Sequence, residues 1–288
     1  MNCFVRLKSG KLKNISELYA TLKNITEMRK LLKIKRIILI SIVWVLYVRV
    51  SAQDISLNKN EYPAGITFRY GLGSFALKDH YISNEKYSGK IQYLSVNWAR
   101  KHEKYAYRLM MEYRNSDEIK NFNVSSSITQ FSLNQGFLYL LKERKFLNKD
   151  LNLYLGPMTE LFFFYNKPDI AVGGFDYAQS VAALFSAGIE FAGIYHIGSA
   201  FQIESSIYMT GLSLGFRMVD SEEDNQSPVK LLSLLSGLNG SFDLGIRYNV
   251  LSHFSIIAGY RFELCRISKW EPLTTASDNL VAGLNWNF

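Results

Sequence analysis

The chain has 288 residues, of which 48% are hydrophobic, and a formal net charge of +8. Beyond residue 52 it holds no apolar run of about 20 residues, the length that a helix needs to cross a bilayer, which argues against a helical membrane protein. The charge does not indicate a nucleic-acid partner either, because it is concentrated in the N-terminal segment. Residues 1–52 carry eleven Lys and Arg and two acids. The rest of the chain therefore has 22 basic and 23 acidic residues, a net charge of −1.

The N-terminal segment has the order of an export signal. From Met28 a basic stretch, MRKLLKIKR, precedes the apolar core IILISIVWVLYV and then RVSAQ. The core is too short for a stable span, and small Ala52 follows Val50 by two positions, so we expect cleavage between Ala52 and Gln53. Residues 1–52 would then be a lead and secretory signal peptide, and residues 53–288 a single domain. The alternative is a buried or amphipathic helix, and the sequence leaves open whether translation starts at Met1 or Met28.

Cysteine usage agrees with export. Cys3 lies in the segment that would be removed, so the mature chain would keep Cys265 alone and form no internal disulfide. No Cys/His group has the spacing of a zinc site. We expect no metal, no cofactor and no lipid anchor.

The rest of the chain alternates with a period of two, as β-strands do. In FDLGIRYNV, residues 242–250, apolar residues fall on one face while Asp243 and Arg247 fall on the other. The same pattern predicts about ten strands, within a range of roughly 8 to 12. They cover residues 64–73, 89–100, 104–114, 129–142, 150–165, 179–194, 199–217, 230–250, 254–265 and 278–288.

The predicted connections alternate in length. Short turns near residues 101, 195 and 251 separate some strands, and longer polar segments near 74–88, 115–128, 166–178, 218–229 and 266–277 separate the others. Outer-membrane barrels show this asymmetry, with turns toward the periplasm and loops outside. A soluble β-barrel or sandwich is the alternative, but the polar face mixes Gly with charges of both signs, and Gly weakens an exposed strand. We therefore favour an all-β, transmembrane, antiparallel up-and-down barrel.

The chain ends on DNLVAGLNWNF, which places apolar residues at every second position up to the terminus. These positions are Leu280, Ala282, Leu284, Trp286 and Phe288. The ending resembles the C-terminal signature of Gram-negative outer-membrane β-barrel proteins. The resemblance implies an outer-membrane location, recognition of the last strand by the barrel assembly machinery, and closure of that strand against the first. Outer-membrane lipid would be a partner, and the oligomeric state stays open.

In such a barrel the inward residues are the first place to look for function. The predicted lumen charges are Arg69, Arg108, Glu112, Glu160, Glu190, Glu204, Asp243, Arg247, Arg261 and Glu263. A barrel of about ten strands has a narrow interior, and an unpaired buried charge costs several kcal/mol, so these groups are expected to pair. The favoured hypothesis is a lumen filled by ion pairs in a protein with a structural or surface-interaction role. The alternative is a narrow porin-like channel for small polar solutes.

An outer-membrane lipid or peptide hydrolase is the third hypothesis. The stretch KDHYISNEK brings Asp79, His80 and Ser83 close together in the first predicted loop. Lipid A deacylases carry a His-x-Ser-Asn element, but here two residues separate His80 from Ser83 and the stretch lies far from the C-terminus. Omptin-type proteases need acidic pairs and an Asp-His couple on facing loops, and Asp79 and His80 are adjacent. The sequence therefore assigns no catalytic residue.

Overall fold

The structure, a computed structural model, describes residues 62–102, 105–121, 124–169, 179–198, 200–217 and 228–288. The predicted signal segment and its cleavage site after Ala52 lie outside these residues. In the described part of the chain, no helix is long and apolar enough to cross a membrane.

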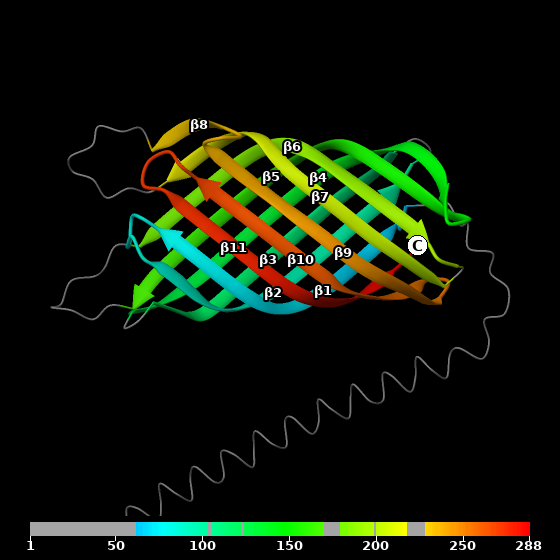
Figure 1. Cartoon of the computed structure of the whole chain (residues 1–288), viewed down its shortest axis with the longest axis horizontal. Helices are drawn as coiled ribbons and strands as arrows, with labels where there is room; N and C mark the ends of the chain where they lie inside the picture. Colours follow the sequence, from blue (N-terminus) through cyan, green and yellow to red (C-terminus); the bar gives the residue numbers. More distant parts are fainter. Residues whose placement is uncertain (1–61, 103–104, 122–123, 170–178, 199, 218–227) are drawn as a thin grey trace, which may run out of the picture. The chain divides into compact units, whose positions relative to one another are not determined.

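Eleven strands make up the structure (Figure 1). Their bounds are β1 Gly65–Asp79, β2 Lys86–Lys101, β3 Tyr105–Asn121, β4 Val124–Phe146, β5 Lys149–Asp169, β6 Ser180–His196, β7 Phe201–Arg217, β8 Val229–Ser233, β9 Gly237–Leu251, β10 Phe254–Ile267 and β11 Leu273–Trp286. Each strand pairs antiparallel with the next one along the chain, except that β8 pairs with β7 alone and β9 pairs with β7 and β10. The last strand pairs with the first along its whole length, from Leu273 opposite Asp79 to Trp286 opposite Ile66. Ten strands, all except β8, thus close into an up-and-down barrel.

The ends of the barrel differ in their connections. We call the end where β1 begins and β11 ends the turn end, because the connections β2–β3, β4–β5, β6–β7 and β9–β10 lie there. The opposite end, where β1 leads to β2 and β10 to β11, is the loop end. The predicted long connection at 115–128 is wrong: β3 continues to Asn121 across a register shift between Ser116 and Ile119, and β4 starts at Val124. Backbone pairing continues through this polar stretch, which the alternation pattern could not reveal.

The outer wall of the barrel is apolar and the inner wall is largely polar. Large apolar side chains exposed on the outside include Phe68, Leu72, Leu94, Met111, Leu161, Phe185, Ile189, Ile207, Leu214, Ile246 and Leu284. Charged residues such as Arg108, Glu112, Glu190 and Arg261 are buried inside. A soluble barrel has the reverse arrangement, since water favours polar groups outside and apolar groups within. The chain is a transmembrane β-barrel.

The predicted strand 230–250 is interrupted in the structure. Residues 234–236 form a turn in which the Ser236 amide donates to the Ser233 carbonyl over 2.9 Å. This turn separates β8, which pairs with the loop-end half of β7, from β9, which pairs with the turn-end half. Leu232 is fully buried, and a Cβ on Gly215 or on Gly237 would come within 2.8 Å of its side chain. The two glycines therefore leave the space in which Leu232 reaches the interior.

Side chains in the lumen change character along the barrel axis. A loop-end cluster of buried apolar residues contains Phe75, Leu77, Tyr87, Ile91, Ile119, Ile128, Phe162, Phe164, Ala182, Leu184, Leu232, Cys265, Ile267 and Leu273. A smaller turn-end cluster contains Ala106, Leu138, Tyr154, Ala192 and Ile194, with Tyr62 packed against it. The charged residues Glu112 and Arg261 lie between the two clusters, whereas Asp79 and Arg217 lie among the loop-end residues.

Candidate functional site

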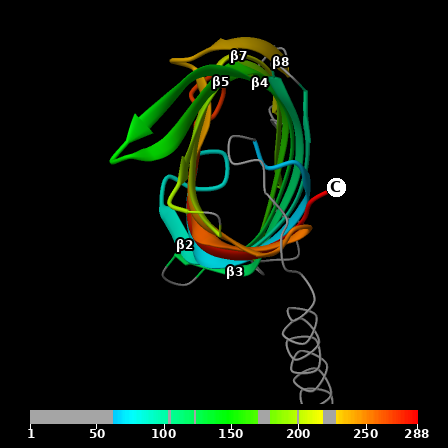
Figure 2. The same ribbon diagram turned by 90° about the vertical axis from the view of Figure 1, so that its right-hand side faces the viewer.

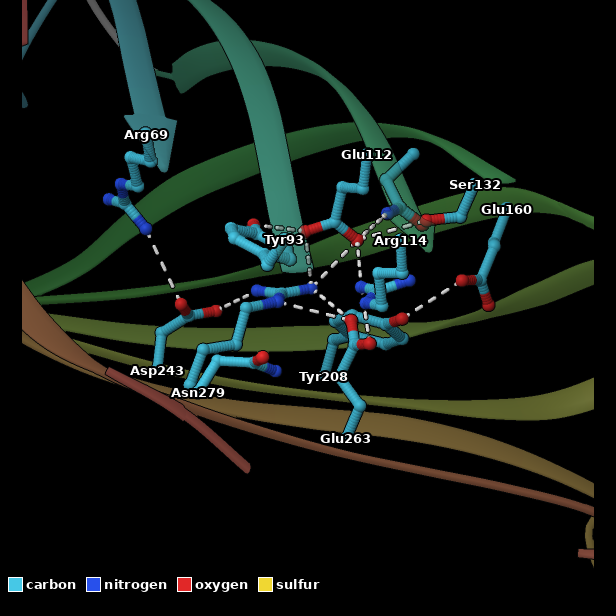
Figure 3. Close-up of polar contacts among 12 residues, drawn as sticks. Arg69, Tyr93, Glu112, Arg114, Ser132, Glu160, Tyr208, Asp243, Glu263 and Asn279 are labelled. Carbon is cyan, nitrogen blue, oxygen red and sulfur yellow. Dashed lines mark hydrogen bonds and ion pairs between the residues drawn. The ribbon is translucent and has the colours of Figure 1, made fainter. Parts of the chain in front are cut away.

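The polar residues in the middle of the lumen form an ion-pair group around Glu112 and Arg261 and a separate hydrogen-bonded group around Glu160, and we call the two together the central network (Figure 3). Its members are Arg69, Tyr93, Glu112, Arg114, Ser132, Glu160, Tyr208, Asn239, Asp243, Arg261 and Glu263. They come from eight strands of the barrel. Each is at an inward position of its strand, so strand alternation alone aims them at the axis.

Glu112 on β3 is at the centre of this network. Its carboxylate accepts hydrogen bonds from the Tyr93 hydroxyl (2.6 Å), the Ser132 hydroxyl (2.9 Å) and Arg114 Nη2 (3.0 Å). Arg261 Nη2, from β10 across the lumen, lies 2.8 Å from Glu112 Oε1. Only 1% of the Glu112 surface is exposed, so these contacts replace its hydration.

Arg261 bridges opposite walls of the barrel. Besides Glu112, its guanidinium contacts Asp243 on β9 and Glu263 on its own strand, the latter over 2.6 Å. The Arg261 side chain is fully buried, and its guanidinium lies 5.7 Å from the centre of the Tyr93 ring. Glu263 also pairs with Arg114. In the middle of the lumen, three carboxylates therefore surround two guanidinium groups, so that each charge lies next to charges of the opposite sign.

Further ion pairs lie on the turn side of this network. Arg69 Nη1 is 3.4 Å from Asp243 Oδ1, and Arg108 Nη1 is 2.7 Å from Glu190 Oε1. Arg247 holds Glu204 through two guanidinium nitrogens, Nη2 donating over 3.2 Å.

Glu160 differs from the other lumen acids. Its two carboxylate oxygens accept from the Tyr208 hydroxyl over 2.9 Å and from the Asn239 amide over 2.7 Å. Within the described residues, no Lys, Arg or His forms an ion pair with it. Only neutral donors therefore hold this carboxyl group.

A second cross-lumen contact lies among the loop-end apolar residues. Arg217, the last residue of β7, donates from Nη2 to Asp79 Oδ1, at the end of β1, over 2.5 Å. Asn166 on β5 donates to the other Asp79 oxygen over 3.4 Å and accepts from Ser126. Asp79 and Arg217 are both fully buried. The Asp79 carboxylate is therefore engaged by Arg217 and Asn166 inside the lumen.

The lumen holds a small cavity. This cavity, of about 60 Å³, lies on the turn side of the central network and is lined by Tyr62, Arg69, Arg108, Glu204 and Arg247 among others. Arg69 Nε, Asn97 Oδ1 and Arg247 Nη1 are buried without a hydrogen-bond partner in the described protein, so the space suits a few ordered waters.

All ten lumen charges expected from the sequence are at inward positions, as the preceding contacts describe. Sequence reasoning missed Asp79, Arg114 and Arg217. Arg114 follows Arg108 and Glu112 on the same face of β3, so extending the alternation by one step would have found it. Asp79 was assigned to a loop, whereas β1 continues to this residue. Arg217 reaches the lumen through a bulge at Gly211, which shifts the register between β6 and β7.

The C-terminal residues singled out in the sequence lie at the seam between β1 and β11. Leu280, Ala282, Leu284 and Trp286 face outward and pair with Leu72, Tyr70, Phe68 and Ile66. The strand ends at Trp286, two residues before the predicted end, so Phe288 lies beyond it and is 65% exposed.

No protein-family model matches the chain, and no curated protein matches it. Among solved structures, it is similar to the outer membrane protease OmpT from Escherichia coli, with 10% identity and a TM-score of 0.46 over 82% of this chain and 99% of that chain. It is also similar to the Neisserial surface protein A, with 13% identity and a TM-score of 0.34 over 79% of this chain and 100% of that chain. A third is the translocator domain of the autotransporter NalP from Neisseria meningitidis, with 9% identity and a TM-score of 0.40 over 80% of this chain and 91% of that chain. The assignment as a membrane barrel rests on the apolar outer wall of this chain and not on these likenesses.

Proposed function

We propose that this chain is a Gram-negative outer-membrane barrel with a closed lumen, and that it has a structural or surface-interaction role. The observation that carries the proposal is the fully buried Arg261, which spans the lumen between Glu112, Asp243 and Glu263. A solute passing through would have to separate these pairs, and each charge left unpaired in the interior costs several kcal/mol.

A second layer supports closure. The loop-end cluster packs fourteen apolar residues across the lumen beyond the central network. An ion would lose most of its hydration there, and the buried Asp79 and Arg217 among these residues are already engaged with each other. A narrow porin-like channel and a hydrolase were the alternatives from the sequence. No described feature favours either, since all the predicted lumen charges except Glu160 form ion pairs with one another and Asp79 is held by Arg217.

The outer-membrane location is part of this proposal. It is supported by an apolar wall made of strands, by the export signal expected before residue 53, and by the apolar ending at Phe288. The last strand would be recognised by the barrel assembly machinery, and the turn end would face the periplasm. Cell fractionation tests the location: recovery in the soluble periplasmic fraction would contradict it.

Ionic conductance in a planar lipid bilayer tests the closed lumen. The purified, refolded protein, with insertion verified by protease resistance, is expected to give no discrete steps, and an open porin treated in the same way is the control. Arg261→Ala is also expected to stay silent, because the loop-end cluster remains. Steps in the parent protein whose ion selectivity shifts in Arg247→Ala or Glu112→Ala would establish a pore and overturn the proposal.

A further inference from the structure

The β4–β5 hairpin extends beyond the rim at the turn end. The last residue of β4 that pairs with β3 is Tyr139, opposite Tyr105, and β6 reaches only as far as Leu151 on β5. Beyond Tyr139 and as far as Phe146, roughly 20 Å at the usual rise per residue, β4 pairs with β5 alone. On the other side β6 accompanies β5 up to Leu151, so residues 145–150 extend beyond both neighbouring strands. In the view from the turn end, the hairpin leaves the ring of strands sideways (Figure 2).

A bulge explains why the hairpin bends. The pairing of β4 with β5 shifts between Leu140 and Lys142, which leaves Leu141 as an extra residue at the rim. Such a bulge bends the strand and turns the following side chains. At the tip, Leu147 and Asn148 have φ values of 51° and 61°, as a two-residue turn with positive φ at both positions requires.

The two faces of the hairpin carry different charges. Cross-strand pairing places Lys142, Arg144, Phe146 and Lys149 on the same face as Leu151 and Leu153, whose neighbour Asn152 is buried in the lumen. This is the continuation of the lipid-facing wall, and we call it the basic face. Glu143, Lys145 and Asp150 are on the opposite face. The basic face therefore carries three cations and no acid, while the opposite face has a net charge of −1.

The bend aims the basic face at the membrane. When a hairpin at the rim leans away from the barrel axis, the side that faced the lipid chains turns toward the surface of the same bilayer. Phe146 is anchored in this position, because the Tyr195 hydroxyl donates to its carbonyl over 3.2 Å and the two rings lie 5.9 Å apart. Within the described residues, no ion pair involves Lys142, Arg144 or Lys149. Three unpaired cations beside apolar residues match a layer of phosphates above hydrocarbon.

We propose that the basic face of the β4–β5 hairpin binds the headgroup phosphates of anionic phospholipids in the leaflet at the turn end, through Lys142, Arg144 and Lys149. The exposed apolar side chains favour a lipid surface over a soluble acidic protein. Phe146 is 57% exposed and Leu147 77%, and the interfacial region accommodates such groups next to cations. The inference depends on the barrel spanning a bilayer and not on whether the lumen is closed.

A spin label on the hairpin tip tests this proposal. Leu147→Cys, in a background with Cys3→Ser and Cys265→Ala, is labelled in the full barrel and reconstituted in nanodiscs of phosphatidylcholine, with or without phosphatidylglycerol. Collisions with oxygen, which concentrates in lipid, are compared with collisions with a water-soluble nickel complex. We expect the label to be shielded from nickel, more strongly with phosphatidylglycerol, and less so in high salt, which screens surface charges.

Two adjacent residues give a matched control. Arg144→Gln on the basic face is expected to lower the ratio of membrane-bound to free hairpin by about fivefold, because one cation fewer then attracts the anionic surface. Lys145→Gln removes the same charge from the opposite face and is expected to change it less than about twofold. Heat-modifiable migration verifies that each variant is folded.

Three results would overturn the proposal. One is a tip label equally open to nickel in both lipids. Another is an equal effect of Arg144→Gln and Lys145→Gln. The third is shielding that develops only after a periplasmic extract is added, which would assign the hairpin to a soluble protein partner instead.

Discussion

The central network and the loop-end cluster lie at inward positions of the same strands, yet they hold opposite kinds of side chain. On β10 the inward residues run Arg261, Glu263, Cys265, Ile267, and on β5 they run Glu160, Phe162, Phe164. Strand alternation decides that all of these point into the lumen, and the residue type decides how each layer excludes water. The network closes the lumen by pairing charges across it, and the cluster closes it by packing.

Removing the central carboxylate should have the largest effect on stability. Glu112→Gln leaves Arg114 and Arg261 buried with one negative partner fewer, and breaking such a group typically costs about 3–5 kcal/mol. The measurement is urea unfolding of the refolded barrel in lipid vesicles, followed by tryptophan fluorescence. A loss below about 1 kcal/mol would mean that the network contributes little to stability.

In the loop-end cluster the cost should come from lost packing. Leu184→Ala removes a fully buried side chain and leaves a cavity, for which about 3 kcal/mol is expected in the same unfolding experiment. Leu161→Ala on the lipid-facing wall is the matched control. Its loss should be smaller, because lipid chains fill the space that the side chain leaves. Equal losses would contradict a packed cluster.

The smallest effect is expected at Glu160. Glu160→Gln keeps a polar group between Tyr208 and Asn239 and leaves no cation without its partner, so the free energy of unfolding should change by less than about 1 kcal/mol. A loss as large as that of Glu112→Gln would show that Glu160 compensates a charge elsewhere in the lumen. The pair of variants therefore separates burial of a carboxyl group from its pairing.

Much of this fold could be predicted from the sequence, because it follows from alternation. The apolar outer wall and the inward position of Arg108, Glu112 and Arg261 all come from a period of two. Features that break the period could not be predicted. Arg217 depends on the bulge at Gly211, and the lateral bend of the β4–β5 hairpin depends on Leu141.

The interruption between β8 and β9 shows a further limit. Residues 230–250 alternate well enough to suggest one strand, but Leu232 turns inward beside Gly215 and Gly237, and the serines hold a turn instead. This arrangement depends on side chains from neighbouring strands that the local pattern does not contain. The ion-pair partner of each lumen charge could not be predicted for the same reason, since Arg261 and Glu112 are 149 residues apart in the sequence.

The closed lumen can be tested most directly through Cys265, a native thiol in the loop-end cluster that is 3% exposed. A small methanethiosulfonate reagent is added from both sides of the folded protein in lipid vesicles, with Asn84→Cys at an exposed position of the β1–β2 connection as the control. Rapid labelling of the control is expected, and labelling of Cys265 only after unfolding. Labelling of Cys265 in the folded barrel at the rate of an exposed thiol would show that small solutes enter the loop-end cluster, and would contradict the packed layer that closes the lumen there.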